Sequence, residues 1–208
     1  MRGRNPNQIV RALRSPVVRS RRLDLTLPDR RRTAEIVRLL NDPTIARWTL
    51  HIPHPYRPRD AQQFFRRWRG RQRTGRVLSL HVVRRRDGAL VGGLGLHDID
   101  AEHLRAEVGY WLGRPFRHQG YAREAVEALC QFAFHRLGLR RIEAGTFPGN
   151  RASAAVLRAT AFRREGLMRE AVRKGGHPVN VILYARLGGD RASSRSGSRR
   201  RPSDAPTR

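Results

Sequence analysis

The feature that most constrains this chain is a small-residue turn between a strand-like run and an amphipathic helix pattern. The turn reads Arg117-His118-Gln119-Gly120-Tyr121-Ala122; the strand-like run before it spans residues 107–112, and the helix pattern runs to residue 137. Such a turn leaves backbone N–H groups at the start of the helix without partners, and the helix dipole adds partial positive charge there. The pattern therefore predicts a phosphate-binding turn, with an ordinary strand–turn–helix connection as the alternative.

The residue types in this turn narrow the choice of phosphate ligand. Its Arg-x-x-Gly-x-Ala pattern lacks the glycine spacing of the dinucleotide-binding fingerprint and the lysine of the nucleoside-triphosphate loop. The pattern therefore argues against both a dinucleotide and a nucleoside triphosphate.

Charge is the second constraint. The chain carries 44 basic residues against 17 acidic ones, for a formal net charge of +27, and Lys174 is its one lysine. Without the basic ends, residues 1–22 and 189–208, the middle of the chain still carries +16. Such a surface attracts nucleic acid, ribosomes or a polyphosphate cofactor and repels polycations. The alternative explanation is an arginine-rich genome and a solvated surface that adheres unspecifically to nucleic acid.

Length and composition predict one folded domain with two extensions. We expect a basic, disordered extension at residues 1–20, in which 9–13 could form a short helical turn, a single domain at 21–188, and a disordered Arg/Ser-rich tail at 189–208. No run of about 18 apolar residues or secretory signal is present, so we expect a cytoplasmic protein. The single cysteine, Cys130, excludes an internal disulfide and a cysteine-based zinc site, and its spacing predicts a buried small hydrophobe.

Apolar periodicity predicts alternating strands and helices. The expected strands are 22–27, 77–83, 89–96, 107–112, 141–147, 162–169 and 179–187. The expected helices begin at Pro28, at an Asp60 N-cap, at the phosphate-binding turn and after Asn150. Asp87-Gly88 predicts a hairpin turn, and the glycines at 92, 93 and 95 predict a bulge or a close approach of two backbones. This order predicts an α/β fold with a mixed, mostly antiparallel twisted sheet flanked by helices.

Motifs in the second half of the chain resemble the GNAT N-acetyltransferase superfamily, and the resemblance covers about residues 22–187. They are Gly109-Tyr110-Trp111-Leu112, Arg117-x-x-Gly120-x-Ala122, Asn150-Arg151-Ala152-Ser153, Phe162 with Glu165-Gly166, and Leu183-Tyr184-Ala185-Arg186. Asn41-Asp42-Pro43 before Arg47-Trp48, and Pro53-x-Pro55-Tyr56 before a helix, are most similar to the Rim-type branch. That branch acetylates N-terminal α-amines of ribosomal proteins.

The resemblance implies a GNAT-like acyl-CoA acyltransferase fold with acetyl-CoA as the co-substrate. The turn would hold its pyrophosphate, and the Arg117 and Arg123 side chains either add charge or are solvated. In this family the strand before the turn carries a bulge that splays it from the next strand, and the pantetheine arm lies in the gap. A backbone N–H near Trp111 and Leu112 would stabilise the oxyanion. The implied cofactor-binding residues are Trp111, Leu112, Arg117, His118, Gln119, Gly120, Tyr121, Ala122, Arg123 and Asn150.

The resemblance also assigns catalytic roles. Ser153 would give a proton to the departing thiolate, and Asn150 would lie beside the pantetheine; the alternatives are an ordinary first-turn helix residue and an N-cap. Glu107 could accept the proton of the amine, directly or through water, or could instead pair with an arginine at the surface.

The general base is the point at which this chain departs from the family. The glutamate usual in Rim-type enzymes aligns with Val172, and Glu170 is a weak substitute because a two-residue offset need not point inward. His51, His54 and His97 are alternatives, although each is expected to be a loop residue. None of the histidines has metal-ligand spacing, so no metal is expected.

Four aromatic residues fall where the acceptor groove lies in this superfamily: Trp48, Tyr56, Phe64 and Trp68. Phe64 and Trp68, four residues apart, fit core packing better. The sequence thus predicts an N-acetyltransferase whose acceptor is an amine-bearing peptide or an amino-acid-like small molecule. The alternative is a non-catalytic RNA- or ribosome-associated module on the same scaffold, recruited by its basic tails.

Overall fold

The structure is a computed structural model that describes residues 6–14, 16 and 18–190. The tail expected at 189–208 therefore lies outside the described residues from 191 onward. Among the described residues, no helix combines the length and the apolar character needed to cross a bilayer.

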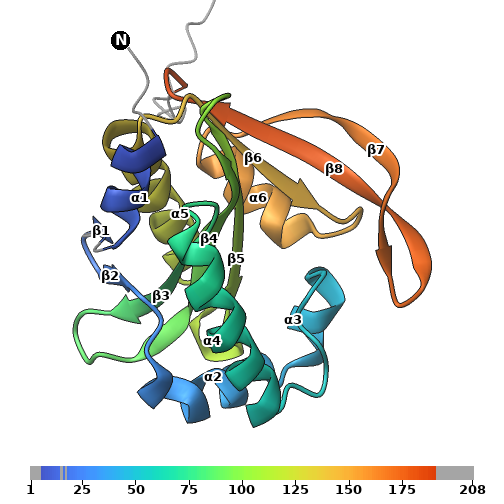
Figure 1. Cartoon of the computed structure of the whole chain (residues 1–208). Helices are drawn as coiled ribbons and strands as arrows, with labels where there is room; N and C mark the ends of the chain where they lie inside the picture. The colour runs from blue at the N-terminus through green and yellow to red at the C-terminus, as the bar shows by residue number, and fades with distance from the viewer. Residues whose placement is uncertain (1–5, 15, 17, 191–208) are drawn as a thin grey trace, which may run out of the picture.

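A single eight-stranded sheet organises the fold (Figure 1). Its order is β1-β2-β3-β4-β5-β6-β8-β7, and every neighbouring pair is antiparallel except β5 and β6. The strands are β1 (Val18–Arg19), β2 (Leu23–Thr26), β3 (Leu78–Arg84), β4 (Leu90–Asp100), β5 (Arg105–Leu112), β6 (Arg141–Thr146), β7 (Arg163–Lys174) and β8 (His177–Leu187). This confirms the predicted mixed, mostly antiparallel α/β sheet.

Helices cover both faces of this sheet. They are α1 (Pro6–Arg14), α2 (Thr33–Leu40), α3 (Pro43–Trp48), α4 (Pro58–Arg73), α5 (Tyr121–Phe132), which continues as the π-helical η3 (Ala133–Leu137), and α6 (Arg151–Ala159). Short 3-10 turns occupy η1 (Arg30–Arg32) and η2 (Arg114–Phe116). One core lies between α1, α5 and the sheet, and a second lies between α2, α4 and the opposite face of β4 and β5.

Local sequence explains most helix starts. Asp42 caps α3 by accepting from the Thr44 N–H at 2.9 Å, and Pro43 occupies the first turn, where no donor is lost. Helix α4 differs from the prediction: it begins at Pro58, and Asp60 lies inside its first turn. The Asp60 carboxylate accepts from the Arg57 N–H at 2.7 Å, so it still satisfies a backbone donor at the helix start.

The N-terminal segment corrects one expectation. Disorder is expected from composition for residues 1–20, yet residues 6–14 form α1, and the short helical turn expected at 9–13 is part of it. Ile9 and Leu13 are four residues apart on one helix face, and both are buried in the larger core. Composition alone misleads here because two well-spaced apolar side chains outweigh the surrounding charge.

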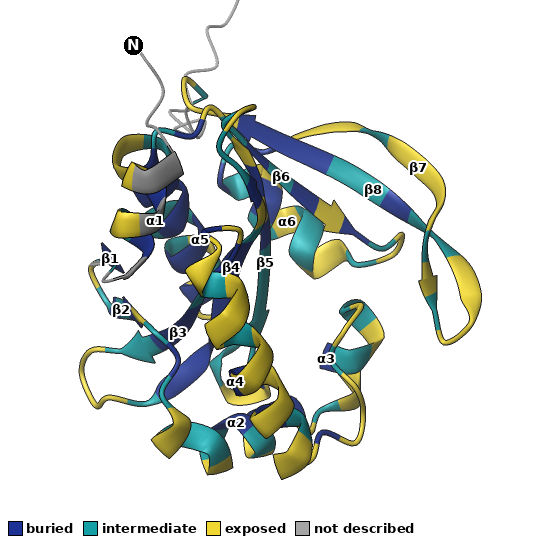
Figure 2. Ribbon diagram, viewed as in Figure 1, coloured by how far each residue is buried: buried dark blue, intermediate teal, exposed yellow. Residues whose placement is uncertain are grey.

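The last two strands form a long hairpin that extends past the rest of the sheet (Figure 1). Its outer strand, β7, is exposed along most of its length (Figure 2). Strand β8 is attached to the body by Arg186. Its side chain is 3% exposed, and its guanidinium donates two hydrogen bonds to the Glu127 carboxylate of α5 at 2.7 and 3.0 Å. This charge-assisted pair holds the inner strand of the hairpin against the central helix.

Candidate active site

The parallel strands β5 and β6 separate at one end. They pair at Arg105–Arg141, Ala106–Ile142 and Glu107–Glu143 only. Beyond Glu107, β5 continues to Leu112 with no partner on that edge, and Figure 1 shows the two strands diverging. The gap expected beside the phosphate-binding turn is therefore present, and we call it the β5–β6 wedge.

The wedge arises without the expected bulge. From Glu107 to Leu112, β5 pairs with β4 in continuous register, and the irregularity lies at its start, between His97 and Asp100. The predicted close approach of backbones does occur: a Cβ on Gly92 would lie 2.2 Å from the Trp111 carbonyl oxygen. Gly92 thus allows β4 to pair closely with this part of β5. Within the described chain, the opposite edge of β5 has no strand partner there.

The turn before α5 presents a row of free backbone N–H groups. His118 and Gly120 have positive φ angles of 60° and 78°, which aim successive N–H groups to one side. Within the described residues, no acceptor engages the N–H groups of 118–123, and the helix ladder starts with Glu124 N–H to Gly120 O at 3.1 Å. The Arg117 N–H instead donates to Arg114 O at 3.4 Å, so the row begins at His118.

Arg22 reinforces this turn, although the sequence gives no sign of it. Its guanidinium donates to the Gln119 carbonyl at 3.1 Å, pairs with Glu124 at 2.6 Å and lies over the Tyr121 ring at 4.5 Å. A cation therefore lies directly beside the free N–H groups. Arg22 precedes Gln119 by 97 residues, so no local pattern could have revealed the contact.

The two arginines expected at the turn behave differently from each other. The Arg117 side chain is engaged by the protein and 28% exposed: it bonds Asp42 at 2.9 Å, Thr44 Oγ1 at 2.8 Å and the Leu112 carbonyl at 3.2 Å. It therefore ties the turn to the start of α3. Arg123 is exposed and has no ion pair among the described residues, so its charge remains available.

Ser153 and Asn150 meet at the start of α6. The Asn150 side-chain oxygen accepts from the Ser153 N–H at 3.1 Å, so the N-cap interpretation is correct and only the side-chain amide nitrogen remains for a ligand. The Ser153 hydroxyl lies 2.9 Å from the hydroxyl of Tyr110 on β5. Burial raises the pKa of Tyr110 to about 12, so this phenol stays protonated and can donate. The sequence singles out Tyr110 only as part of a motif, with no role of its own.

A second polar group that the sequence does not reveal lies at the end of β6. The Thr146 hydroxyl is buried and has no hydrogen-bond partner among the described residues. Buried hydroxyls are normally satisfied, so this orphan at the end of β6 is a candidate contact for a bound molecule. The free edge of β5 at Trp111 and Leu112, the free N–H groups of the turn and Thr146 can therefore all receive an extended polar ligand.

Glu107 stands where the β5–β6 wedge opens. Although part of its side chain meets solvent, the protein atoms around its carboxylate desolvate it and raise its pKa. The Gly145 N–H partly offsets this effect, and the charges of Asp98 and Glu143 add to it. A Cβ on Gly145 would lie 3.4 Å from Glu107 Oε1, so glycine leaves room beside the carboxylate.

His97 is the cross-strand neighbour of Glu107 on β4. It is therefore a strand residue and not a loop residue as expected. Burial lowers its pKa, with the nearby charge of Arg71 adding to the effect, so the neutral imidazole is favoured. His51 and His54 are exposed in the loop after α3.

An open groove of about 480 Å³ separates α3 from the β7–β8 hairpin. It is lined by Arg47, Trp48, Phe147, Pro148, Glu170, Lys174 and residues 178–180. Glu170 therefore does face a groove: its φ of 49° falls at the irregularity between Met168 and Val172, which shifts the register. Val172 does not line this groove.

Lys174 connects the two walls of the groove. Its ammonium donates to the Ala46 carbonyl at 2.7 Å and also to the Thr49 carbonyl, both at the end of α3. It also lies 5.6 Å from the centre of the Phe147 ring. The hairpin is thus attached to α3 by one cation.

Of the four aromatic residues expected near an acceptor, Trp48 alone lines the groove. Tyr56 is 6% exposed, and Trp68 packs against the same core as Tyr56. Phe64 is 37% exposed, so the core position expected for it is wrong. Among the described residues, no cluster of three or more metal-ligating side chains is found.

Known proteins are similar in sequence to part of this chain. The family model described as an acetyltransferase (GNAT) domain matches residues 22–163. An uncharacterized N-acetyltransferase of Bacillus licheniformis is 34% identical over 113 residues, which cover 54% of this chain and 64% of that protein. A ribosomal-protein-serine acetyltransferase of Escherichia coli is 28% identical over 102 residues, 49% of this chain and 57% of that protein. The chain thus spans less than two thirds of the length of these relatives.

Solved structures give broader coverage. A Vibrio cholerae protein provisionally described as a ribosomal-protein-serine acetyltransferase superposes with a TM-score of 0.73 at 27% identity, covering 82% of this chain and 96% of that one. RimJ of Mycobacterium smegmatis, solved with a CoA-disulfide, has the same TM-score at 24% identity and covers 80% of this chain and 82% of its own. At that identity the second match concerns the fold alone.

Proposed function

This chain belongs to the GNAT acetyltransferase family, and on that basis we propose that it transfers an acetyl group from acetyl-coenzyme A to a primary amine. The acceptor we propose is a protein N-terminal α-amine or an amino-acid-like small molecule. The observation that carries the proposal is the free row of N–H groups at 118–123 next to the open end of the β5–β6 wedge. The row suits a diphosphate, and the wedge suits the extended arm that follows it.

Three tasks fall to the protein, since acetyl-coenzyme A supplies the acyl group as a thioester. The amine must lose a proton, the carbonyl oxygen must be polarised, and the departing thiolate must gain a proton. Glu107 serves as the base because its raised pKa brings its basicity closer to that of the amine. An N–H on the free edge of β5 polarises the carbonyl. Ser153 passes a proton to the thiolate and regains one from solvent, and Tyr110 orients its hydroxyl.

The groove beside α3 receives the acceptor. Its charged lining residues are Arg47, Lys174 and Glu170, so it offers partners both to a carboxylate and to an α-amine. The net charge of +27 repels polyamines and aminoglycosides. An α-amine with a pKa near 8 is also easier to deprotonate than a lysine side chain with a pKa of about 10.4. The Escherichia coli relative is described as a ribosomal-protein-serine acetyltransferase, which supports the N-terminus of a ribosomal protein as the acceptor. For the same reason we propose that the protein acts in the cytoplasm.

The direct test measures thiol release from acetyl-coenzyme A with a panel of peptides that differ in their first residues, and locates the acetyl group by mass spectrometry. We expect acetylation at the N-terminal amine, and loss of it in Ser153→Ala and Glu107→Gln. Coenzyme binding is tested separately with Gly120→Ala, because Gly120 has φ 78° and an added Cβ would lie 3.3 Å from Arg22 Nη2. That variant should bind coenzyme A more weakly while its Michaelis constant for the acceptor is unchanged.

Two results would count against the proposal. One is wild-type turnover in both active-site variants. The other is tight coenzyme binding with no acetylated product from any primary amine, which would favour the non-catalytic RNA- or ribosome-associated module.

A further inference from the structure

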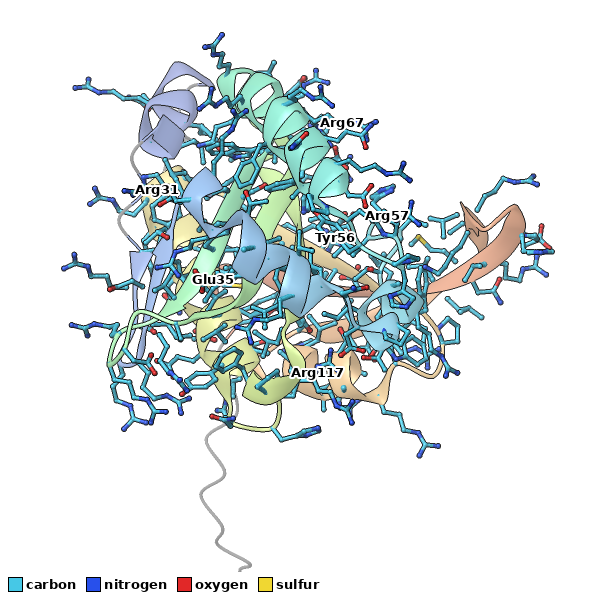
Figure 3. All side chains as sticks on the ribbon, turned by 90° about the horizontal axis from the view of Figure 1, so that it is seen from below. Arg31, Glu35, Tyr56, Arg57, Arg67 and Arg117 are labelled. Carbon is cyan, nitrogen blue, oxygen red and sulfur yellow. The ribbon has the colours of Figure 1, made fainter. Side chains whose placement is uncertain are left out.

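Six exposed arginines are concentrated in the second half of α4 and the turn after it. They are Arg66, Arg67, Arg69, Arg71, Arg73 and Arg76. No acidic residue lies between Asp60 and Asp87 in the sequence. Figure 2 shows the outer face of α4 to be largely exposed, and Figure 3 shows Arg67 among the side chains that project from it. We call these six residues the α4 strip.

Several arginines elsewhere in the fold are neutralised by carboxylates. Arg22 pairs with Glu124, Arg84 with Asp87 and Arg186 with Glu127. In the α4 strip, by contrast, Arg71 with Asp98 at 3.7 Å is the one ion pair that the described residues make. A genome bias toward arginine would account for the number of arginines, but not for the scarcity of acidic partners on this surface.

The strip also opposes helix formation. Arg66, Arg69 and Arg73 are three and four residues apart, and so share one side of α4, as do Arg67 and Arg71. Like charges at these spacings repel and destabilise a helix. A bound polyanion would remove that repulsion, so the arrangement favours an anionic ligand over a bare surface.

The strip borders a groove of about 440 Å³. Arg66, Arg67, Gly70, Arg71, Thr74, Arg76 and Asp98 line it. Guanidinium groups bind phosphate oxygens through paired N–H donors, and four arginines line this one hollow beside the single carboxylate of Asp98. Gly70 has no heavy atom near the place of a Cβ, so a ligand backbone can approach the helix closely there.

We propose that the α4 strip and its groove bind the phosphate backbone of RNA. This binding does not depend on acetyl transfer. We name RNA and not DNA as the ligand because the proposed function places the acceptor on the ribosome. A membrane surface fits less well, because the apolar side of α4 is used internally: Ala61 and Phe65 are 0% and 1% exposed. A surface whose charged side chains are nearly all cationic suits a nucleic acid, which carries a negative charge at every nucleotide.

The test measures the affinity of the full chain for a fluorescent RNA hairpin at several salt concentrations, without acetyl-coenzyme A. The strip variant carries Arg66→Gln, Arg67→Gln, Arg69→Gln and Arg73→Gln. The matched control carries Arg38→Gln, Arg136→Gln, Arg158→Gln and Arg164→Gln, four exposed arginines on other elements, so both lose the same charge. A third variant replaces the four strip arginines with lysine. Removal of residues 189–208 measures what the tail contributes.

We expect the strip variant to bind RNA at least about tenfold more weakly, and its salt slope to fall by roughly 0.7–0.9 for each phosphate that it no longer neutralises. The control should weaken far less, and the lysine variant should keep most of the slope. In the wild type, ultraviolet cross-links to RNA should map to α4. This measurement needs no variant, so it tests the proposal even if a variant folds poorly. Turnover on a small free amine should be unchanged in the strip variant.

Four outcomes would overturn the proposal. They are equally weakened binding in the strip and control variants, cross-links confined to residues outside α4, a salt slope that is the same in the strip variant and the wild type, and strip-dependent capture by anionic lipid vesicles with no strip-dependent RNA binding. None of these outcomes bears on whether the protein acetylates amines, because acetyl-coenzyme A is absent from the assay.

Discussion

Tyr110 and Ser153 share a hydrogen bond of 2.9 Å between their hydroxyl groups, although they come from β5 and α6. The bond joins the strand on one side of the β5–β6 wedge to the helix that follows β6 in the chain. The Tyr110 hydroxyl also lies 3.3 Å from the Ser153 carbonyl oxygen, and because it stays protonated it can donate to either oxygen of Ser153. Donation to the hydroxyl oxygen leaves the serine proton free for another acceptor.

The first prediction follows from this pair. Ser153→Ala should lower kcat by about 10²-fold or more, as expected for loss of a general acid. Tyr110→Phe should lower kcat by less and leave the Michaelis constant for acetyl-coenzyme A unchanged. Steady-state kinetics of both variants and of their combination provide the check: if the two losses simply multiply in the double variant, Tyr110 does not act through Ser153.

The second prediction concerns pH. Only the ionised Glu107 can accept a proton, so kcat/KM should fall as the pH drops through its raised pKa, and Glu107→Gln should remove that limb of the profile.

The effect of Glu107 on the stability of the protein has the opposite dependence on pH. A raised pKa means that the folded state holds the proton more tightly than the unfolded one, so ionisation of Glu107 at neutral pH costs stability. Glu107→Gln should therefore melt at the same or a higher temperature at pH 7, and that gain should disappear below the unfolded pKa. A lower melting temperature at pH 7 would contradict this account.

The third prediction concerns the contact between Arg117 and Asp42. Burial alone would raise the pKa of Asp42, but hydrogen bonds from Thr44 and the charge of Arg117 outweigh it and hold that pKa below its ordinary value. Arg117→Ala should lower the free energy of unfolding by about 1–3 kcal/mol, because it leaves a largely buried carboxylate without its partner.

The Arg117–Asp42 pair also makes stability depend on pH. Because the folded pKa of Asp42 is depressed, its contribution is present above the unfolded pKa and is lost as the pH falls through the folded one. Urea titrations at pH 7 and pH 3 should show a smaller difference between wild type and Arg117→Ala at the lower pH. Asp42→Asn in the Arg117→Ala background should recover part of the loss at pH 7; no recovery would show that the charge pair is not the cause.

The fourth prediction concerns Lys174. Lys174→Met should raise the Michaelis constant for the acceptor, because the hairpin loses its hydrogen bonds to the end of α3 and the groove loses its fixed width. The Michaelis constant for acetyl-coenzyme A should not change, since the phosphate-binding turn is elsewhere. Faster hydrogen exchange in α3 should accompany the change, and Lys174→Arg should preserve more of the acceptor affinity than Lys174→Met does.

The fifth prediction concerns Cys130. Burial raises the pKa of its thiol to about 12, and the residue is 0% exposed. The folded protein should therefore resist alkylation by iodoacetamide at pH 8 and react fully only in denaturant. Rapid modification in the native state would show that the interior beneath α5 opens more readily than its packing indicates.

Local sequence signals were sufficient to predict most of the fold. The Asp87-Gly88 turn and the alternation in the flanking strands predicted the β3–β4 hairpin, and Asn150 marked the start of α6. In α1, local composition misled, because burial of Ile9 and Leu13 depends on helices that come much later in the chain.

The candidate site was predictable only where its parts are contiguous. The turn at 117–122 could be read directly, because its N–H groups belong to neighbouring residues. Arg22, Tyr110 and Thr146 were missed, because each owes its place to a partner far away or to the divergence of two strands. The same reason explains Arg117: the sequence shows an arginine beside a phosphate-binding turn, and only the fold shows Asp42 already paired with it.

The attachment of Lys174 has a consequence for the protein as a target of its own chemistry. An enzyme that acylates primary amines can also modify amines on its own surface, and most of these are lysine side chains. Here every other basic side chain apart from histidine is a guanidinium, which such an enzyme does not acylate. The sole lysine ammonium is held by two carbonyl oxygens. With arginine in place of lysine at nearly every basic position, the protein exposes few side-chain amines to its own reaction.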